Sequence, residues 1–160
     1  MKYLGVCAAA AFLALASGAA AQETAPPHAG HVSFDRTTLA AGAHTFARYC
    51  LGCHSLKYLR YNRVAEDLGL SEARVKDLLM LPDNAQYHDA MTNTLRPEDA
   101  AKWLGAAPPD LTLEARFRGA DWIYAYLTGF YLDPSAALSW NNRVFPHVSM
   151  PNVLAPLGGA

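Results

Sequence analysis

The chain has 160 residues, with 13 basic and 14 acidic side chains and a formal net charge of -1. This near-neutral balance, without a block of basic residues, argues against nucleic acid as a partner. The length is sufficient for one domain with a modest hydrophobic core.

Residues 1–21 have the layout of a secretory signal peptide. Lys2 is their one charged residue, an apolar run follows it, and small residues precede Gln22. The alanine and glycine content of this run makes a membrane span the weaker alternative. We therefore expect export and cleavage before Gln22, followed by an extended arm over residues 22–36. No later segment contains the about 18 consecutive apolar residues that a membrane helix needs.

A helix is predicted from Thr38 onward. Its apolar residues recur at helical spacing, and either Thr37 or Thr38 is the expected N-cap. This helix leads directly into the next feature of the chain. The apolar positions are Leu39, Ala43, Phe46, Ala47 and Cys50.

Cys50, Cys53 and His54 form a C-x-x-C-H motif, which is the signature of covalent c-type haem attachment. Each thiol can form a thioether to one haem vinyl group, while the adjacent imidazole ligates the iron. A structural zinc site would need four Cys or His ligands, and the remaining cysteine, Cys7, lies in the predicted signal peptide. A thioredoxin-like dithiol would need a strand before the motif and gives the histidine no task. We therefore predict one covalently bound haem c and electron transfer.

Further helices are predicted after the motif from their start and stop signals. The segment 57–67 has no clear assignment, and no alternating pattern is long enough to predict a sheet. The predicted fold is therefore an all-α, cytochrome c-like haem domain with short helices and long loops. The predicted helices are residues 72–79 between Ser71 and Pro82, residues 97–104 ahead of Gly105, and residues 121–128 ahead of Gly129.

A second axial ligand is needed unless the distal side of the haem is open. Met150 precedes Pro151, which favours an extended backbone, and a stiff loop of this kind can hold a thioether against iron. An exposed methionine beside a proline can equally have no function. Met80 has the position of a core residue, and Met91 has no evident role. The other candidates are His28, His31, His44, His88 and His147.

Four segments together resemble bacterial cytochrome c1, the haem subunit of the ubiquinol:cytochrome c oxidoreductase (cytochrome bc1) complex. The first is generic to c-type cytochromes, whereas the other three in this order are specific to cytochrome c1. The segments are residues 47–62, residues 105–112 with Arg116 and Arg118 behind them, residues 124–131 and residues 140–154.

The resemblance implies a role for each matched residue. Cys50 and Cys53 would hold the haem, His54 would be the proximal ligand and Met150 the distal ligand, a pair that favours reduced iron. Arg118 would pair with a haem propionate, because a planar guanidinium makes two hydrogen bonds to a carboxylate. The alternative for this arginine is a solvated surface charge.

The resemblance also implies partners and location. An iron-sulfur (Rieske) protein and cytochrome b would be neighbouring subunits, and the chain would pass one electron from the iron-sulfur protein to a c-type cytochrome. This subunit would make or break no substrate bond, and it would lie on the periplasmic side of the inner membrane, held in the membrane complex by its partners.

Family members continue beyond the methionine segment into a helix packed across the haem-bearing helix, and then into a C-terminal membrane anchor. Since this sequence stops at Ala160, we expect a C-terminally truncated haem domain over residues 37–160. The alternative function is a truncated haem protein with an open distal site, reactive toward gases or peroxide and inactive in the complex.

Overall fold

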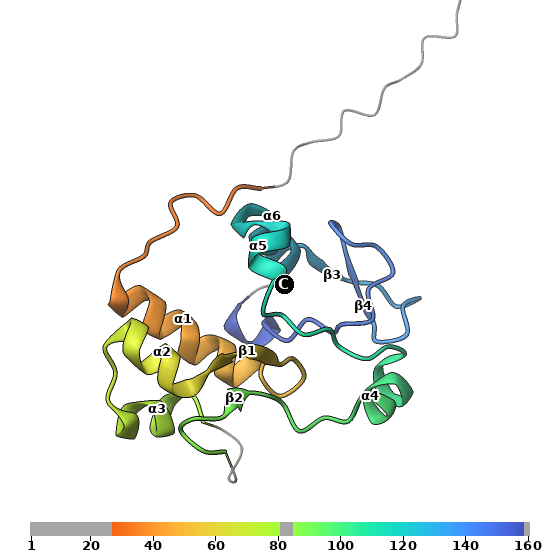
Figure 1. Ribbon diagram of the computed structural model, residues 1–160. Coiled ribbons are helices and arrows are strands. Elements are labelled where there is room, and N and C mark those ends of the chain that lie inside the picture. The colour runs from red at the N-terminus through yellow and green to blue at the C-terminus, as the bar shows by residue number, and fades with distance from the viewer. Residues whose placement is uncertain (1–26, 81–84, 159–160) are drawn as a thin grey trace, which may run out of the picture.

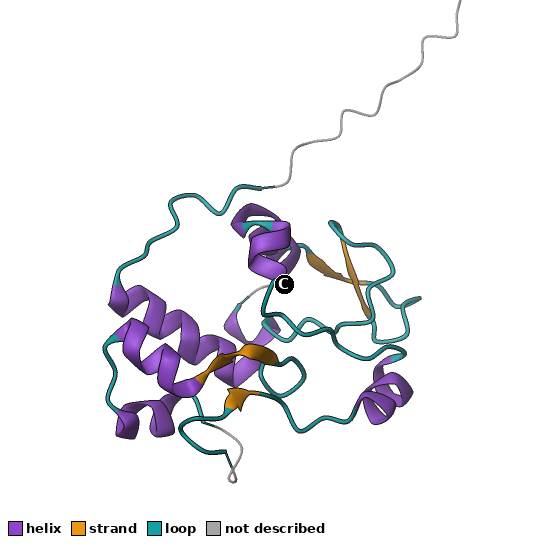
Figure 2. Cartoon of the chain, in the orientation of Figure 1, coloured by secondary structure: helices purple, strands orange, loops and turns teal. Residues whose placement is uncertain are grey.

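The computed structural model describes residues 27–80 and 85–158. The predicted signal peptide and Pro82 lie outside the described residues. The chain is made mainly of short helices and long loops, with two small sheets (Figures 1 and 2), and this confirms the predicted all-α class. In the described ranges no helix is long and apolar enough to cross a membrane. The elements in chain order are α1 (Arg36–Tyr49), β1 (Leu56–Arg60), α2 (Tyr61–Leu68), α3 (Glu72–Leu78), β2 (Ala90–Met91), α4 (Pro97–Leu104), α5 (Glu114–Arg118), α6 (Ala120–Thr128), β3 (Phe130–Leu132), β4 (Trp140–Asn142) and the 3-10 turn η1 (Ala155–Leu157).

The main hydrophobic core lies between α1, α2, α3 and β2. Burial of large apolar side chains here supplies the main stabilising contribution, about 1.5–3 kcal/mol for each one fully buried. This core fixes the C-terminal end of α1, where Cys50 is the C-cap between the buried residues Ala47 and Leu51. The buried core residues are Ala47, Leu51, Tyr61, Val64, Ala65, Val75, Leu79 and Met91.

The helix starts and stops follow local signals in the sequence. The hydroxyl of Ser71 accepts a hydrogen bond from the Arg74 amide and caps α3 as predicted. Gly105 ends α4 in the left-handed region, at a φ of 82° that favours glycine. The predicted N-cap of α1 was wrong. Asp35 is the cap, because its carboxylate accepts from the Thr38 amide at 2.9 Å, and both threonines lie inside the helix.

Two antiparallel sheets of two strands each correct the expectation that the chain has none. β1 pairs with β2 through Leu56 opposite Met91, with an irregular register, and β3 pairs with β4. Three of the four strands have only two or three residues, too few for an alternating pattern to be visible in the sequence. The second sheet follows α6 and leads into the segment that contains Met150.

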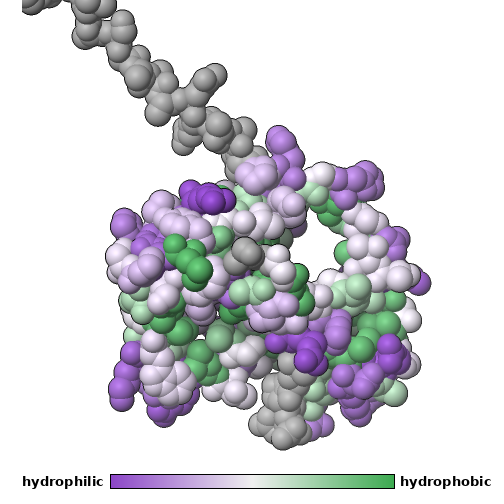
Figure 3. All heavy atoms as spheres, turned by 180° about the vertical axis from the view of Figure 1, so that it is seen from behind, coloured by the Kyte–Doolittle hydropathy of each residue, from purple (hydrophilic) through white to green (hydrophobic). Residues whose placement is uncertain are grey.

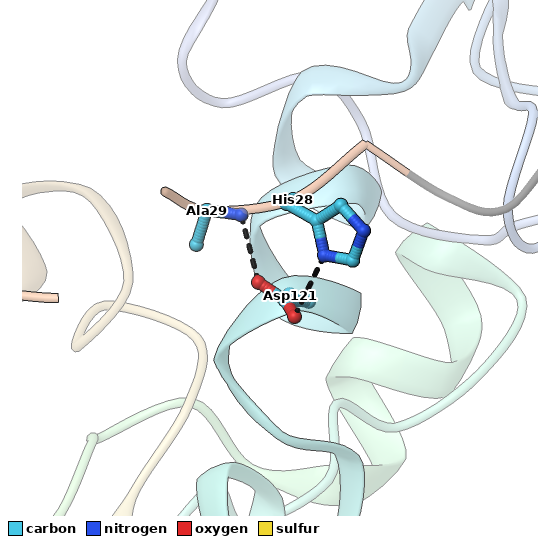
Figure 4. Close-up of polar contacts among 3 residues, drawn as sticks. All are labelled: His28, Ala29 and Asp121. Carbon is cyan, nitrogen blue, oxygen red and sulfur yellow. Dashed lines mark hydrogen bonds and ion pairs between the residues drawn. The ribbon is translucent and has the colours of Figure 1, made fainter. Parts of the chain in front are cut away.

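Residues 27–35 connect α6 to the start of α1 as an arch (Figure 1). At its far end, His28 Nδ1 donates to Asp121 Oδ2 at 3.1 Å, and the Ala29 amide donates to Asp121 Oδ1 at 2.8 Å (Figure 4). At its near end, Asp35 caps α1. The space-filling view from behind shows an opening through the molecule beside this arch (Figure 3). Between the two ends most side chains of the arch are exposed, among them Val32 and Phe34, so the hydrogen bonds at the ends are its main attachments.

We expect replacement of Asp121 by Ala to release the arch from α6 and speed chymotrypsin cleavage after Phe34, whose side chain is 79% exposed. The Ala29 amide, and then His28, hold the pKa of Asp121 below its usual range. The carboxylate therefore stays charged at neutral pH, and its contribution is lost only as the pH falls through the lowered pKa. Asp67→Ala, which removes an exposed ion pair on α2, is the control. Equal cleavage rates in the two variants would contradict this anchor.

Two glycines have opposite surroundings and give a paired prediction. Gly42 lies in α1 with open space around an added Cβ, so Gly42→Ala should stabilise the protein by about 0.5–1 kcal/mol. An added Cβ at Gly129 would lie 2.6 Å from the Ala125 carbonyl oxygen. Gly129→Ala should therefore destabilise it by about 1–3 kcal/mol. Denaturant unfolding followed by circular dichroism measures both, and an unchanged midpoint for Gly129→Ala would contradict the close approach.

Candidate functional site

The C-x-x-C-H motif forms one tight turn at the end of α1. Cys50 is the C-cap, and its carbonyl oxygen accepts hydrogen bonds from the Cys53 amide at 3.0 Å and from the His54 amide at 2.8 Å. Between them Leu51 is buried in the core. Both thiols are free and half-buried. The core thus fixes the turn while its sulfur atoms remain accessible to a group lying against it.

The His54 ring is held by one hydrogen bond, from Nδ1 to the Pro109 carbonyl oxygen at 2.8 Å. A carbonyl oxygen only accepts, so the proton resides on Nδ1. Nε2 then carries the free lone pair, which is the state a neutral imidazole needs in order to ligate a metal. Pro109 was not predicted as a site residue, although it lies in residues 105–112, one of the four segments that carry the family resemblance.

A loop after α4 lies along the motif and fixes this arrangement. The Leu111 amide donates to the Ser55 carbonyl oxygen at 2.9 Å, and the Lys57 amide donates to Asp110 at 2.9 Å. Burial opposes ionisation of Asp110, but hydrogen bonds from Thr112 and Lys57 hold the pKa of its carboxyl below the usual range. The aspartate therefore stays charged and keeps the loop attached next to the proximal histidine.

Asn93 supports the motif from another side. Its amide nitrogen Nδ2 donates to the Cys53 carbonyl oxygen at 2.6 Å, and its backbone amide donates to the Ser55 hydroxyl at 3.0 Å. A cavity of about 230 Å³ lies beside Cys53, between this asparagine and the loop that carries Asp110. The motif therefore lies at the edge of a cavity, and hydrogen bonds from Asn93 hold its backbone in place.

The surroundings of the two thiols suit thioether attachment better than thiol redox chemistry. Burial, and then the proximity of Cys53, raise the pKa of the Cys50 thiol. Reactive redox cysteines show the opposite, a lowered pKa. A helix, α1, precedes the motif in place of the strand that a thioredoxin-like site needs. Two thiols, an imidazole with free Nε2 and a thioether elsewhere in the chain are a donor set that fits a c-type haem.

Met150 lies in the segment after β4. Its sulfur accepts a hydrogen bond from the Tyr126 hydroxyl at 3.4 Å. Gly105 begins the loop whose Pro109 binds His54, and a Cβ added at Gly105 would lie 3.9 Å from the hydroxyl of Ser149. The same loop therefore also lies close to the residue that precedes Met150. The chain thus links the proximal and distal segments through one loop. Burial raises the pKa of Tyr126 to about 12, so its hydroxyl stays protonated at neutral pH.

Two adjacent asparagines of β4 organise the segment before Met150. Asn142, which is 1% exposed, donates to the Tyr126 carbonyl oxygen at 2.7 Å and accepts from the Val144 and Phe145 amides. Asn141 accepts from the His147 amide at 2.9 Å. Tyr126 and these two asparagines were not predicted as site residues. The sequence signal that could have indicated the tyrosine is its position four residues after Trp122, because side chains four positions apart on a helix lie next to each other.

The structure places Arg118 against protein groups. Its Nε lies 3.3 Å from Glu114 Oε2, and its guanidinium lies 4.3 Å from the centre of the Trp122 ring. Trp122 in turn stacks on Tyr126 at 5.2 Å, so these contacts connect Arg118 to the partner of Met150. Its pairing with a propionate stays a prediction from the resemblance.

The other methionines near the core have structural surroundings. Met91 is 2% exposed inside the hydrophobic core, and Met80 packs against the same core. Among the histidines, His28 binds Asp121. Within the described residues, no group of three or more His, Cys, Asp or Glu side chains lies together as a metal site. Met150 thus remains the candidate ligand, and the Tyr126 hydroxyl orients its sulfur.

A mainly helical domain whose first helix ends in a C-x-x-C-H turn, with the histidine Nδ1 held and Nε2 free, has the features of a c-type cytochrome. The model of the Cytochrome C1 family matches residues 28–156, and the chain belongs to this family. Cytochrome c1 proteins carry a covalently bound c-type haem, and haem c is accordingly the cofactor.

Several curated proteins are similar to the chain. Cytochrome c1 of Allochromatium vinosum is 48% identical over 125 residues, which are 78% of this chain and 51% of that protein. The ammonia monooxygenase gamma subunit of Nitrosomonas europaea is 42% identical over 125 residues, 78% of this chain and 53% of that protein. Cytochrome c1 of Rhodospirillum rubrum is 32% identical over 128 residues, 67% of this chain and 46% of that protein. The chain spans about half the length of the curated relatives it matches.

Proposed function

We propose that the chain transfers single electrons through haem attached at Cys50 and Cys53, with His54 and Met150 as axial ligands. When bound, haem supplies an iron that takes up and releases one electron. The observation that carries the proposal is the hydrogen bond from His54 Nδ1 to Pro109, because it leaves Nε2 available and fixes the ring beside both thiols.

The residues around the site perform the remaining tasks. The loop bonded to Ser55 and Lys57 fixes the proximal side, while Tyr126 and Asn142 fix the segment of Met150. If His54 and Met150 both bound the iron, no coordination position would be open, and this would favour electron transfer over binding of gases or peroxide. A thioether ligand also favours the reduced iron, as an acceptor of electrons from a quinol-oxidising system requires.

We infer the partners from the family. The chain would accept its electron from an iron-sulfur protein and pass it to a c-type cytochrome, within a quinol:cytochrome c oxidoreductase that also contains cytochrome b. The predicted export signal supports a position on the periplasmic side of the inner membrane. Because the Arg118 guanidinium already contacts Glu114, Arg118 would hold a haem propionate only by binding the propionate and Glu114 together.

The proposal is tested by absorption spectroscopy of the full chain, expressed with export and c-type haem maturation machinery, in oxidised and reduced forms. We expect a covalent low-spin haem with the weak far-red band of sulfur-to-iron charge transfer, unchanged by carbon monoxide. Met150→Leu should remove that band and admit carbon monoxide. Met80→Leu is the matched control, because it makes the same volume-conserving change at a core residue.

Two results would contradict parts of the proposal. Covalent haem without the far-red band, binding carbon monoxide in the unchanged chain, would favour the open distal site reactive toward gases or peroxide. Absence of any covalent pigment would exclude electron transfer through haem c and return the motif to thiol or zinc chemistry.

A further inference from the structure

We propose that Tyr126 is a positioning residue for Met150: its hydroxyl donates a hydrogen bond to the thioether, holds that sulfur toward the haem and raises the reduction potential. The inference rests on the proposed function, in which Met150 is the distal ligand. The geometry that points to it is the distance of 3.4 Å between the Tyr126 hydroxyl oxygen and Met150 Sδ.

Aromatic neighbours on several sides fix the direction of the Tyr126 ring. Trp122 stacks against it with ring centres 5.2 Å apart and planes inclined by 7°. Phe130 and Phe145 contact the Tyr126 ring edge-on, with ring centres 5.3 and 6.5 Å from its centre. A tyrosine side chain has two rotatable bonds, and packing of this kind restricts both. The hydroxyl is therefore aimed at the sulfur by the packing of the ring.

The segment on the other side of the contact is fixed to the same residue. Asn142 binds the Tyr126 carbonyl oxygen through Nδ2 and the amides of Val144 and Phe145 through Oδ1. The backbone of Tyr126 thus anchors the start of the segment, and its hydroxyl contacts the sulfur of Met150 near the end. Because Tyr126 makes both contacts, a movement of α6 would carry the segment and the hydroxyl with it. The distance between the Tyr126 hydroxyl and Met150 Sδ is thereby maintained.

The chemistry follows from the two lone pairs of a thioether sulfur. One lone pair can ligate iron while the other accepts a hydrogen bond, for which sulfur is a weak acceptor. The bond draws electron density away from sulfur and makes it a weaker donor to iron. Weaker donation disfavours the oxidised state more than the reduced state, so the hydrogen bond raises the potential. Hydrogen bonding by groups behind a ligand is an established way in which proteins tune metal potentials.

Tyr126→Phe tests the inference because it removes the hydroxyl and keeps the ring that stacks on Trp122. Tyr124→Phe is the matched control, since Tyr124 lies on the same helix and its side chain is 44% exposed. Both are compared with the unchanged holoprotein in a redox titration followed by absorption, with the far-red charge-transfer band recorded for each. Thermal unfolding of each variant establishes that it is folded.

We expect Tyr126→Phe to lower the midpoint potential while the far-red band persists, and Tyr124→Phe to leave the potential unchanged. Loss of the band in folded Tyr126→Phe would also support the positioning role. An unchanged or raised potential with the band intact would overturn the inference, even though electron transfer through His54 and Met150 would stand. Absence of the band from the unchanged protein would instead show that the proposed ligation, and this inference with it, is wrong.

Discussion

Replacement of Cys50 and Cys53 together by Ala is expected to abolish covalent haem attachment, whereas either single replacement leaves one thioether. The reason is the geometry of the turn, in which the Cys53 and His54 amides both donate to the Cys50 carbonyl oxygen. This arrangement fixes the spacing of the two sulfurs relative to the imidazole. Intact-protein mass spectrometry under denaturing conditions measures the effect as loss of the mass of one haem.

The control for this prediction is Cys7→Ala, because Cys7 is the third cysteine of the chain and lies in the predicted signal peptide. It should leave the haem content of the mature protein unchanged. The double variant is also compared with His54→Ala, which keeps both thiols and removes the imidazole. Haem retained covalently by the Cys50/Cys53 double variant would show that attachment occurs elsewhere and would contradict the assignment of the motif.

The local features of the site were predictable from sequence because they depend on neighbouring residues. The C-x-x-C-H turn, the Ser71 cap of α3 and the glycine end of α4 each arise within a few positions of the chain. The N-cap of α1 was misplaced because Asp35, Thr37 and Thr38 are all capping types within four positions. Asp35 is the N-cap because its carboxylate accepts the hydrogen bond from the Thr38 amide, and the order of these three residues in the sequence does not show which one makes that bond.

Features that depend on distant residues were not predictable in the same way. β1 was unassigned because its partner, β2, comes about thirty residues later and contains only two residues. α5 was missed because it has five residues, fewer than a periodic pattern needs. Pro109 became the partner of His54 only through the fold of the loop after α4. The hydrogen bond of Tyr126 with Met150 likewise joins residues 24 positions apart.

Buried asparagines illustrate the limit of reasoning from hydrophobicity. Asn141 and Asn142 are 7% and 1% exposed, although polar side chains usually lie at the surface. Each is buried because its side-chain oxygen accepts hydrogen bonds from backbone amides of the irregular segment after β4, where no strand supplies a carbonyl oxygen for them. A loop whose amides have no strand to pair with needs such acceptors, because buried donors left without partners are costly. The polar pair therefore belongs to the architecture of the distal side.

Asn142→Ala is accordingly expected to lower the free energy of unfolding by about 1–3 kcal/mol, since it removes the acceptor of two part-buried amides and leaves the Tyr126 carbonyl with the Gly129 amide as its remaining donor. Denaturant unfolding followed by circular dichroism measures this loss. Thr45→Ala is the control, because it removes one hydrogen bond of an exposed side chain to the Ala41 carbonyl and should change stability by less than about 0.5 kcal/mol.

The same substitution separates support of the fold from support of the ligand. Release of the Val144 and Phe145 amides frees the segment that carries Met150, so the far-red charge-transfer band should weaken below the denaturant concentration at which the protein unfolds. The proximal side is held by the hydrogen bonds of His54 to Pro109 and of Leu111 to Ser55, in which Asn142 takes no part, so covalent haem should remain. A band that persists until global unfolding would show that the distal segment is stable without the asparagine. The fold would then hold Met150 through Tyr126 and its aromatic neighbours.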